Sequence, residues 1–125
     1  MKKLILFLLI ALPYTLQADE IQDYKVALSF YQDQYYDLAE EAFLEIINNY
    51  PNSLYYLKCH YYLGLSQLRQ QKYNEAIDNL LYLTKVKAWD QKTSLNYYLT
   101  LCYFFTSQYQ SSENYLDKKI GRAHV

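Results

Sequence analysis

The sequence predicts an all-α fold, a solenoid of about three helical hairpins with six helices in total. The chain of 125 residues is 52% apolar and 20% charged, which is typical of a protein with a hydrophobic core. Its two glycines and two prolines supply too few tight turns for an all-β fold. A short block beginning with tyrosine also recurs at spacings of 37 and 36 residues, which indicates a repeated helical unit.

Residues 1–18 have the pattern of a secretory signal peptide. Lys2 and Lys3 precede an unbroken apolar run over residues 4–12, Pro13 interrupts it, and Ala18 is a small residue at the expected cleavage site. A run of nine apolar residues is well short of the roughly 20 that span a bilayer. We therefore expect an exported protein of the periplasm or cell envelope, with no membrane span in the mature chain.

The first helix of each hairpin is expected over residues 20–32, 54–70 and 92–106, where amphipathic segments occur. Short polar links such as Gln70-Gln71-Lys72 join each of them to the block that follows, which favours helical hairpins. Pro51 cannot continue a helix, and Asn52 or Ser53 can cap the next one.

The recurring blocks are expected to form the second helix of each hairpin. They begin at Tyr36, Tyr73 and Tyr109. Each block has a small residue three positions after the tyrosine and a large apolar residue four positions later, namely Ala39 and Phe43, Ala76 and Leu80, and Ser112 and Leu116. This spacing places both residues on one helical face, where the small one permits close approach of a neighbouring helix. The resulting repeats span residues 20–53, 54–90 and 91–119.

The last six residues, 120–125, are treated separately. They are the translation of ATC GGA AGA GCA CAC GTC, a string contained in a common sequencing-library adapter. We interpret them as read-through and exclude them from the fold, as one excludes a fusion scar. The expected domain is therefore 19–119, and we expect natural sequence to continue past Lys119.

The middle repeat carries Leu63-Gly64, Ala76, Leu80 and Leu83, and the first carries Ala27, Ala39, Phe43, Ile46 and Pro51. These positions resemble the tetratricopeptide repeat (TPR). The stretch from Phe43 to Ser53, followed by Tyr61-Tyr62-Leu63-Gly64, further resembles repeats of the periplasmic Tol-Pal coordinator and the Bam-complex assembly lipoprotein. The resemblance implies a scaffold that binds other proteins, and a part in cell-envelope assembly.

No constellation for chemistry is apparent. His60, Cys59 and Cys102 make no recognised zinc spacing, and there is no glycine-rich phosphate loop. The two cysteines are offset by about 10 Å along equivalent helices, so no disulfide is expected. The net charge of −1 lacks a basic block for nucleic acid. We expect no enzyme, no cofactor and no metal, and we interpret Glu40, Glu41 and Asp78 as a solvated face.

In the TPR family the partner surface is the concave groove formed by the first helices, and the resemblance implies an aromatic groove in this chain. The candidate residues are Tyr24, Tyr31, Lys58, Tyr61, Arg69, Tyr97 and Phe104. Tyr24, Tyr61 and Tyr97 recur at one repeat position and could offer ring faces and hydroxyl groups to a peptide. Lys58 and Arg69 alone do not reproduce the carboxylate clamp of chaperone-tail adaptors.

Two alternatives remain open at the level of sequence. The tyrosines can instead pack on the following first helix, and Phe104 and Phe105 can be covered by a further repeat. The chain can also be the N-terminal repeat module of a longer exported enzyme or receptor. The function favoured by the sequence is an exported scaffold that binds a peptide or partner protein.

Overall fold

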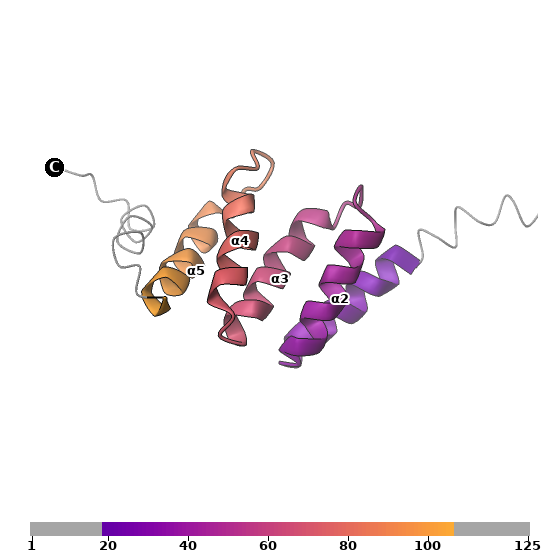
Figure 1. Ribbon diagram of the computed structural model, residues 1–125. Helices are drawn as coiled ribbons and strands as arrows, with labels where there is room; N and C mark the ends of the chain where they lie inside the picture. Colours follow the sequence, from indigo (N-terminus) through magenta and orange to yellow (C-terminus); the bar gives the residue numbers. More distant parts are fainter. Residues whose placement is uncertain (1–18, 107–125) are drawn as a thin grey trace, which may run out of the picture.

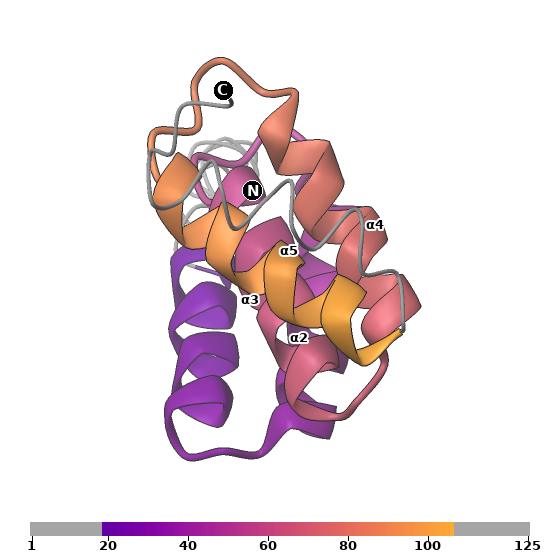
Figure 2. The ribbon, with the colours of Figure 1, turned by 90° about the vertical axis from the view of Figure 1, so that its left-hand side faces the viewer.

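The computed structural model of the chain describes residues 19–106, and every regular element there is an α-helix. A first helix over residues 19–32 is followed by α2 (Tyr36–Asn49), α3 (Tyr56–Arg69), α4 (Tyr73–Thr84) and α5 (Lys92–Phe105). Figure 1 shows these helices side by side in chain order, and Figure 2 views the row from the α5 end. The all-helical prediction is confirmed for this part of the chain. The signal peptide, the block at Tyr109 and the last six residues lie outside it.

The hairpin turns repeat as closely as the helices do. Gln34 and Gln71, which are 37 residues apart, both have positive φ, at 66° and 64°. A residue that is not glycine adopts this left-handed conformation at a cost of about 1 kcal/mol, so each turn is held by its surroundings. The Gln71 N–H, for example, donates to the Leu68 carbonyl at 3.0 Å. The polar segments that the sequence predicts between the helices of each hairpin therefore form turns.

The helix α3 begins at Tyr56, two residues later than its sequence pattern predicts. Ser53 forms a turn of its own in the link, because its Oγ accepts a hydrogen bond from the Tyr55 N–H at 3.0 Å. Its carbonyl also accepts from the Tyr56 N–H at 3.2 Å. No side chain caps α3, so the capping role expected of Asn52 or Ser53 is wrong. Pro51 does follow the end of α2, as expected.

The small-and-large pairs of the first two blocks lie in the core as predicted, and the third pair lies outside the described residues. Ala39, Phe43, Ala76 and Leu80 all have no exposed surface. A Cβ built on Gly64 of α3 would lie 3.0 Å from the Leu80 side chain of α4, which is tighter than ordinary contact. The glycine therefore lets the two helices of the middle repeat approach each other closely.

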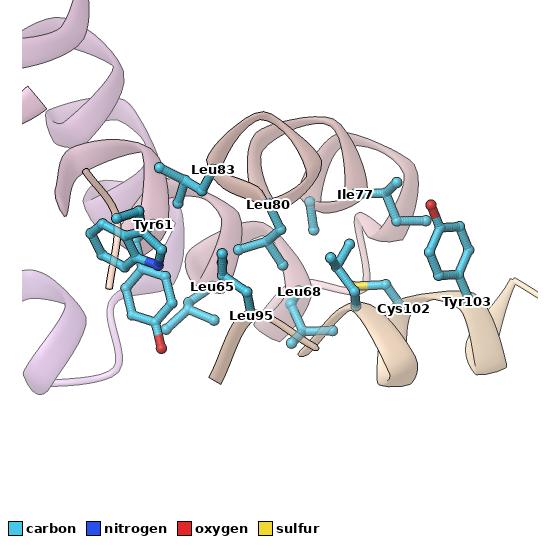
Figure 3. Close-up of a cluster of buried hydrophobic side chains, with 12 residues drawn as sticks. Tyr61, Leu65, Leu68, Ile77, Leu80, Leu83, Leu95, Cys102 and Tyr103 are labelled. Atoms are coloured by element: carbon cyan, nitrogen blue, oxygen red, sulfur yellow. The ribbon is translucent and has the colours of Figure 1, made fainter. Parts of the chain in front are cut away.

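Two clusters of buried side chains run along the row. The first is built from the first helix, α2 and α3, and the second from α3, α4 and α5 (Figure 3). Cys59 lies in the first cluster and Cys102 in the second, and both are free thiols. Burial raises the pKa of each thiol to about 12, so both are protonated and unreactive at neutral pH. The helix α3 belongs to both clusters and joins the repeats.

Lys92 ties the start of α5 to the end of α4. Its Nζ donates to the carbonyl oxygens of Leu83, Thr84 and Val86 at 3.1, 3.3 and 2.8 Å. Leu83 and Thr84 are the last two residues of α4, where a helix leaves its final carbonyls without an intrahelical donor. The Leu83 and Val86 carbonyls also accept the backbone N–H groups of Val86 and Trp89, both at 3.2 Å. A cation at a helix C-terminus also faces the negative end of the helix dipole. One lysine thereby fixes the junction between the second and third repeats.

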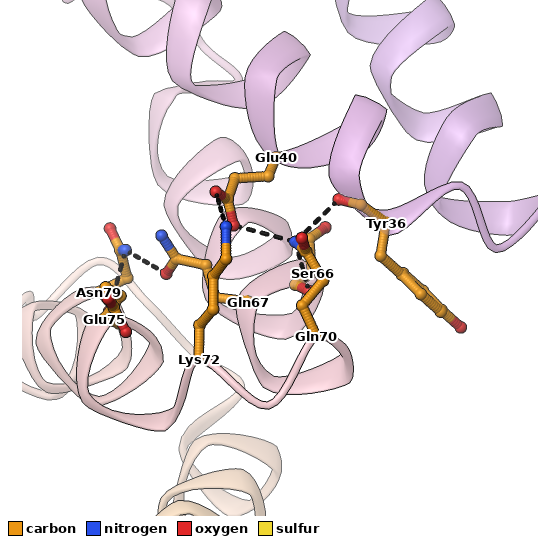
Figure 4. Close-up of polar contacts among 8 residues, drawn as sticks. All are labelled: Tyr36, Glu40, Ser66, Gln67, Gln70, Lys72, Glu75 and Asn79. Atoms are coloured by element: carbon orange, nitrogen blue, oxygen red, sulfur yellow. Dashed lines mark hydrogen bonds and ion pairs between the residues drawn. The ribbon is translucent and has the colours of Figure 1, made fainter.

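A polar cluster joins α2 to α3 and to the turn that follows it (Figure 4). The Gln70 amide donates to the Tyr36 carbonyl, to Glu40 Oε2 and to the Ser66 carbonyl at 3.2, 3.0 and 3.1 Å. Glu40 also accepts from Lys72 Nζ at 2.8 Å. The expectation that Glu40 only faces solvent is wrong, because the next repeat brings two donors to its carboxylate. Glu41 and Asp78 are exposed, as expected.

We expect Gln70→Ala to lower the free energy of unfolding by about 1–3 kcal/mol, because it removes the hydrogen bonds that the Gln70 amide donates to the Tyr36 carbonyl and to Glu40 Oε2 of α2. Lys72→Ala serves as the matched control, since its ammonium is solvent-exposed and the pair with Glu40 is screened by salt. Urea denaturation of both variants measures the difference. A Gln70→Ala chain no less stable than Lys72→Ala would show that this cluster does not hold the repeats together.

Candidate protein-interaction site

The structure buries two of the three tyrosines that the sequence places in a groove. Tyr24 and Tyr61 are each 8% exposed, whereas Tyr97 of α5 is 41% exposed. Burial raises the pKa of Tyr24 and of Tyr61 to about 12. The rings of Tyr24 and Tyr61 therefore serve the core, and only Tyr97 presents a large part of its ring to solvent.

Each buried tyrosine is covered by an aromatic residue from the link that precedes the following first helix. Tyr55, directly before α3, stacks on Tyr24 with ring centroids 4.3 Å apart and an interplanar angle of 12°. Trp89, three residues before α5, lies 5.1 Å from Tyr61 and is itself 6% exposed. The sequence analysis selected neither residue. The signal that could have found them is an aromatic residue shortly before each first helix.

The remaining groove candidates divide between covered and accessible positions. Tyr31 is half-buried beside Tyr36 and Tyr62. Burial raises its pKa, and the neighbouring Arg69 guanidinium acts in the opposite direction. Arg69 is exposed and lies 6.0 Å from the centre of the Tyr36 ring, a cation–π distance. Lys58 is exposed and Phe104 is 54% exposed.

A pocket of about 380 Å³ lies between the end of α3, the turn after it and α5. Leu68, Arg69, Gln71, Tyr73, Tyr97, Tyr98, Leu101 and Phe105 line it. Phe105 is 55% exposed although its ring stacks on Tyr73, with centroids 5.2 Å apart. The pocket therefore brings together the candidate residues Arg69 and Tyr97 with Phe105, which also lies at a groove position of its first helix, and adds Tyr73 of α4.

The pocket combines aromatic and aliphatic side chains with polar groups, among them the Arg69 guanidinium and the Gln71 amide, and its lining has no carboxylate. Within residues 19–106 no acidic side chain lies within ion-pair distance of Arg69. Exposed aromatic side chains of this kind are enriched where proteins bind one another, because they bury much area at a small entropic cost. The geometry suits a peptide or helix that presents an apolar side chain.

His60 lies between α3 and α4 in the middle repeat. Its Nδ1 is 3.0 Å from Asn79 Oδ1, and the Asn79 amide donates to Gln67 Oε1 at 2.8 Å. This orientation of the Asn79 amide makes His60 Nδ1 the donor, so Nε2 carries a lone pair, and that atom is buried without a partner. Burial lowers the His60 pKa, while the bond to Asn79 acts in the opposite direction. His60 is therefore a structural, neutral histidine.

Neither a metal site nor a membrane-spanning helix is found in the described part of the chain. No three His, Cys, Asp or Glu side chains of residues 19–106 gather to hold a metal ion. The helices there are too short or too polar to cross a bilayer.

Residues 23–53 and 58–86 match the tetratricopeptide repeat family. These two segments are therefore similar to tetratricopeptide repeats, a family of helical protein-interaction scaffolds. A comparison with curated proteins gave no match. A third repeat is expected over residues 91–119, and α5 corresponds to its first helix. The rest of that repeat stays a prediction.

The buried neutral state of His60 predicts that the chain loses stability on acidification. The His60 pKa is lower in the folded chain than its ordinary value of about 6.5, so the contribution of neutral His60 is complete above that pH. It is lost as the pH falls below 6.5 through the folded-state value, because unfolding then binds a proton. Thermal melting of the natural chain and of His60→Phe between pH 7.5 and 5 measures this. The stability difference between them should narrow or reverse as the pH falls, and a difference independent of pH would contradict the assignment.

Proposed function

We propose that this chain is a non-catalytic scaffold that binds a partner protein at the α5 end of its row of helices. The observation that carries the proposal is the pocket between α3 and α5, where the rings of Tyr97 and Phe105 are exposed while Tyr24 and Tyr61, the equivalents of Tyr97, are buried. The proposal moves the binding site away from Tyr24 and Tyr61, which support the core. It keeps Tyr97 and Arg69 and places Phe105 beside them.

A charge placed on Phe105 should abolish partner binding without unfolding the chain. Peptides selected from a random phage-displayed library on the chain from Asp19 onward are expected to lose at least about tenfold in affinity for Phe105→Glu, because a carboxylate in an apolar pocket must be desolvated. Isothermal calorimetry gives the affinities, and circular dichroism checks that the variant remains helical.

Leu44→Glu is the matched control, because Leu44 is an exposed apolar residue of α2, 46% exposed, and is not part of the pocket. Its affinity for the selected peptides should stay within about threefold of the natural chain, which corresponds to less than 1 kcal/mol. Equal losses in both variants, or selected peptides insensitive to Phe105→Glu, would place the binding surface elsewhere.

We also propose that the scaffold acts after export, in the periplasm or cell envelope, as a component of envelope assembly. The support is the order of charged, apolar and small residues over positions 1–18. Fusing residues 1–24 to alkaline phosphatase lacking its own leader should give active enzyme in a bacterial host, since that enzyme needs an oxidising compartment for its disulfides. Lys2→Glu with Lys3→Glu should reduce this activity several-fold. An inactive fusion with the natural residues would refute export.

A further inference from the structure

A groove of about 190 Å³ lies between the first helix, over residues 19–32, and α2. Val26 is 39% exposed and Phe30 is half-buried, so the groove is partly open and largely apolar. Asp23 and Glu45, both exposed, contribute one carboxylate from each of the two helices. The full lining is Asp23, Val26, Phe30, Ala42, Glu45 and Ile46.

The same face of the second repeat is covered by α2. Residues of the first helix and α3 that are 37 apart occupy equivalent positions. Val26 corresponds to Leu63, which is 3% exposed and lies in one core cluster with Phe43 of α2. Phe30 corresponds to Gln67, which is 9% exposed. The helix that precedes α3 in the chain therefore covers on the second repeat the face that forms a groove on the first.

The sequence before the first helix repeats the pattern of the sequence before α3. Pro51-Asn52-Ser53-Leu54 precedes α3, and Pro13-Tyr14-Thr15-Leu16 precedes the first helix. Each segment has a proline, then a hydroxyl group two positions later and a leucine three positions later. The helix α2 lies before Pro51, and the apolar run of residues 4–12 lies before Pro13. A run without glycine or proline can form a helix, so residues 1–18 match α2 and its link in order.

The two prolines set the register between residues 1–12 and α2. Ile5 and Leu9 then correspond to Phe43 and Ile47, which pack in the core cluster that α2 shares with α3. Residues spaced by three and four positions lie on one face of a helix. A helix over the leader would therefore present apolar side chains where α2 does.

The charges at the two junctions are reversed. Lys2 takes the position of Glu40, whose carboxylate accepts hydrogen bonds from Gln70 and Lys72 in the turn after α3. In the turn after the first helix, the position of Gln70 is occupied by the exposed Asp33. The first repeat as a whole has seven carboxylates and one lysine, so its charge is complementary to a segment that begins with two lysines.

We propose that residues 1–12 of the uncleaved chain dock in this groove as a helix, in the way that α2 docks on α3. The apolar face of the segment lies on the groove, and Lys2 lies beside Asp33. The link of residues 13–18 is a short tether, which gives an effective concentration of about millimolar, so that a weak intrinsic affinity suffices. The inference adds a second role to the proposed leader, because its removal opens the groove. It does not depend on the pocket between α3 and α5.

Disulfide trapping in the full chain tests the docking. Synthesis in a cell-free lysate without membranes keeps the leader attached. Ile5→Cys is combined with Val26→Cys in the groove or, as the matched control, with Leu44→Cys, which is 46% exposed and outside the groove. Two cysteines form a disulfide only when their Cα atoms come within about 7 Å. Non-reducing electrophoresis and mass spectrometry measure the rate of bridging, and the natural chain, whose thiols are buried, gives the background.

The Val26→Cys pair is expected to form its disulfide at least about tenfold faster than the Leu44→Cys pair, because docking holds the segment at the groove. Equal rates in the two pairs overturn the proposal and leave the groove to a separate protein. Bridging between two molecules that is faster than bridging within one also overturns it, because the occupant is then the leader of a second copy.

Reversal of charge tests the register. Asp33→Lys should slow bridging of the groove pair by about threefold, and Lys2→Asp added to it should restore the rate, since an exposed ion pair contributes modestly. Asp78→Lys, on the exposed face of α4, is the matched control and should leave the rate unchanged. Folding should survive Asp33→Lys, because Asp33 bonds to the Ser29 carbonyl through its backbone N–H. A rate insensitive to Asp33→Lys overturns the proposal.

Failure of this inference can be distinguished from failure of the proposed function. The peptide-binding test of the α3–α5 pocket uses the chain from Asp19 onward, which lacks the leader. The export test uses residues 1–24 alone, which lack α2 and Asp33. Export of that fusion together with equal bridging rates in the two cysteine pairs would leave the proposed function standing while this inference fails.

Discussion

The structure depends on the burial of the first helix of each repeat by the first helix of the following repeat. A hairpin of two helices has more apolar surface than its own partner helix can cover, so a repeat is stable only beside a neighbour. The tyrosines show this directly, because Tyr24 and Tyr61 are each covered by a ring from the link before the following first helix. Since α3 contributes to both core clusters, the stability of the first repeat and that of the second are coupled through one helix.

Polar contacts at the junctions fix how the repeats meet. Apolar packing alone tolerates small shifts of one helix along another, because it has no directional requirement. The Gln70 amide, in contrast, has three acceptors at set distances on α2 and α3. The partly buried hydrogen bonds from Gln67 through Asn79 to His60 impose the same requirement on α3 and α4. Any shift would leave such groups unpaired away from water, at a cost of about 1–3 kcal/mol each.

The helices and the core pairs could be predicted from the sequence because they depend on local periodicity. Ala39 with Phe43, and Ala76 with Leu80, share a helical face wherever the helix packs. The covering rings of Tyr55 and Trp89 could not be predicted in this way, because they lie in links without periodicity. The pairing of Glu40 with Gln70 was missed for a related reason. A helical face shows that a side chain points outward, but not that the next repeat brings a donor to it.

The same limitation explains why the candidate site was only half predicted. Tyr24, Tyr61 and Tyr97 are one residue type at one repeat position, so the sequence gives them one role. Their exposed fractions of 8%, 8% and 41% separate them into two buried residues and one exposed residue. Within residues 19–106, Tyr24 and Tyr61 are each covered by a ring that precedes a following first helix, and such coverage is a property of the assembled row and not of any one repeat. In this part of the solenoid, one residue type at one repeat position therefore packs in the core twice and is largely exposed once, with no change of sequence.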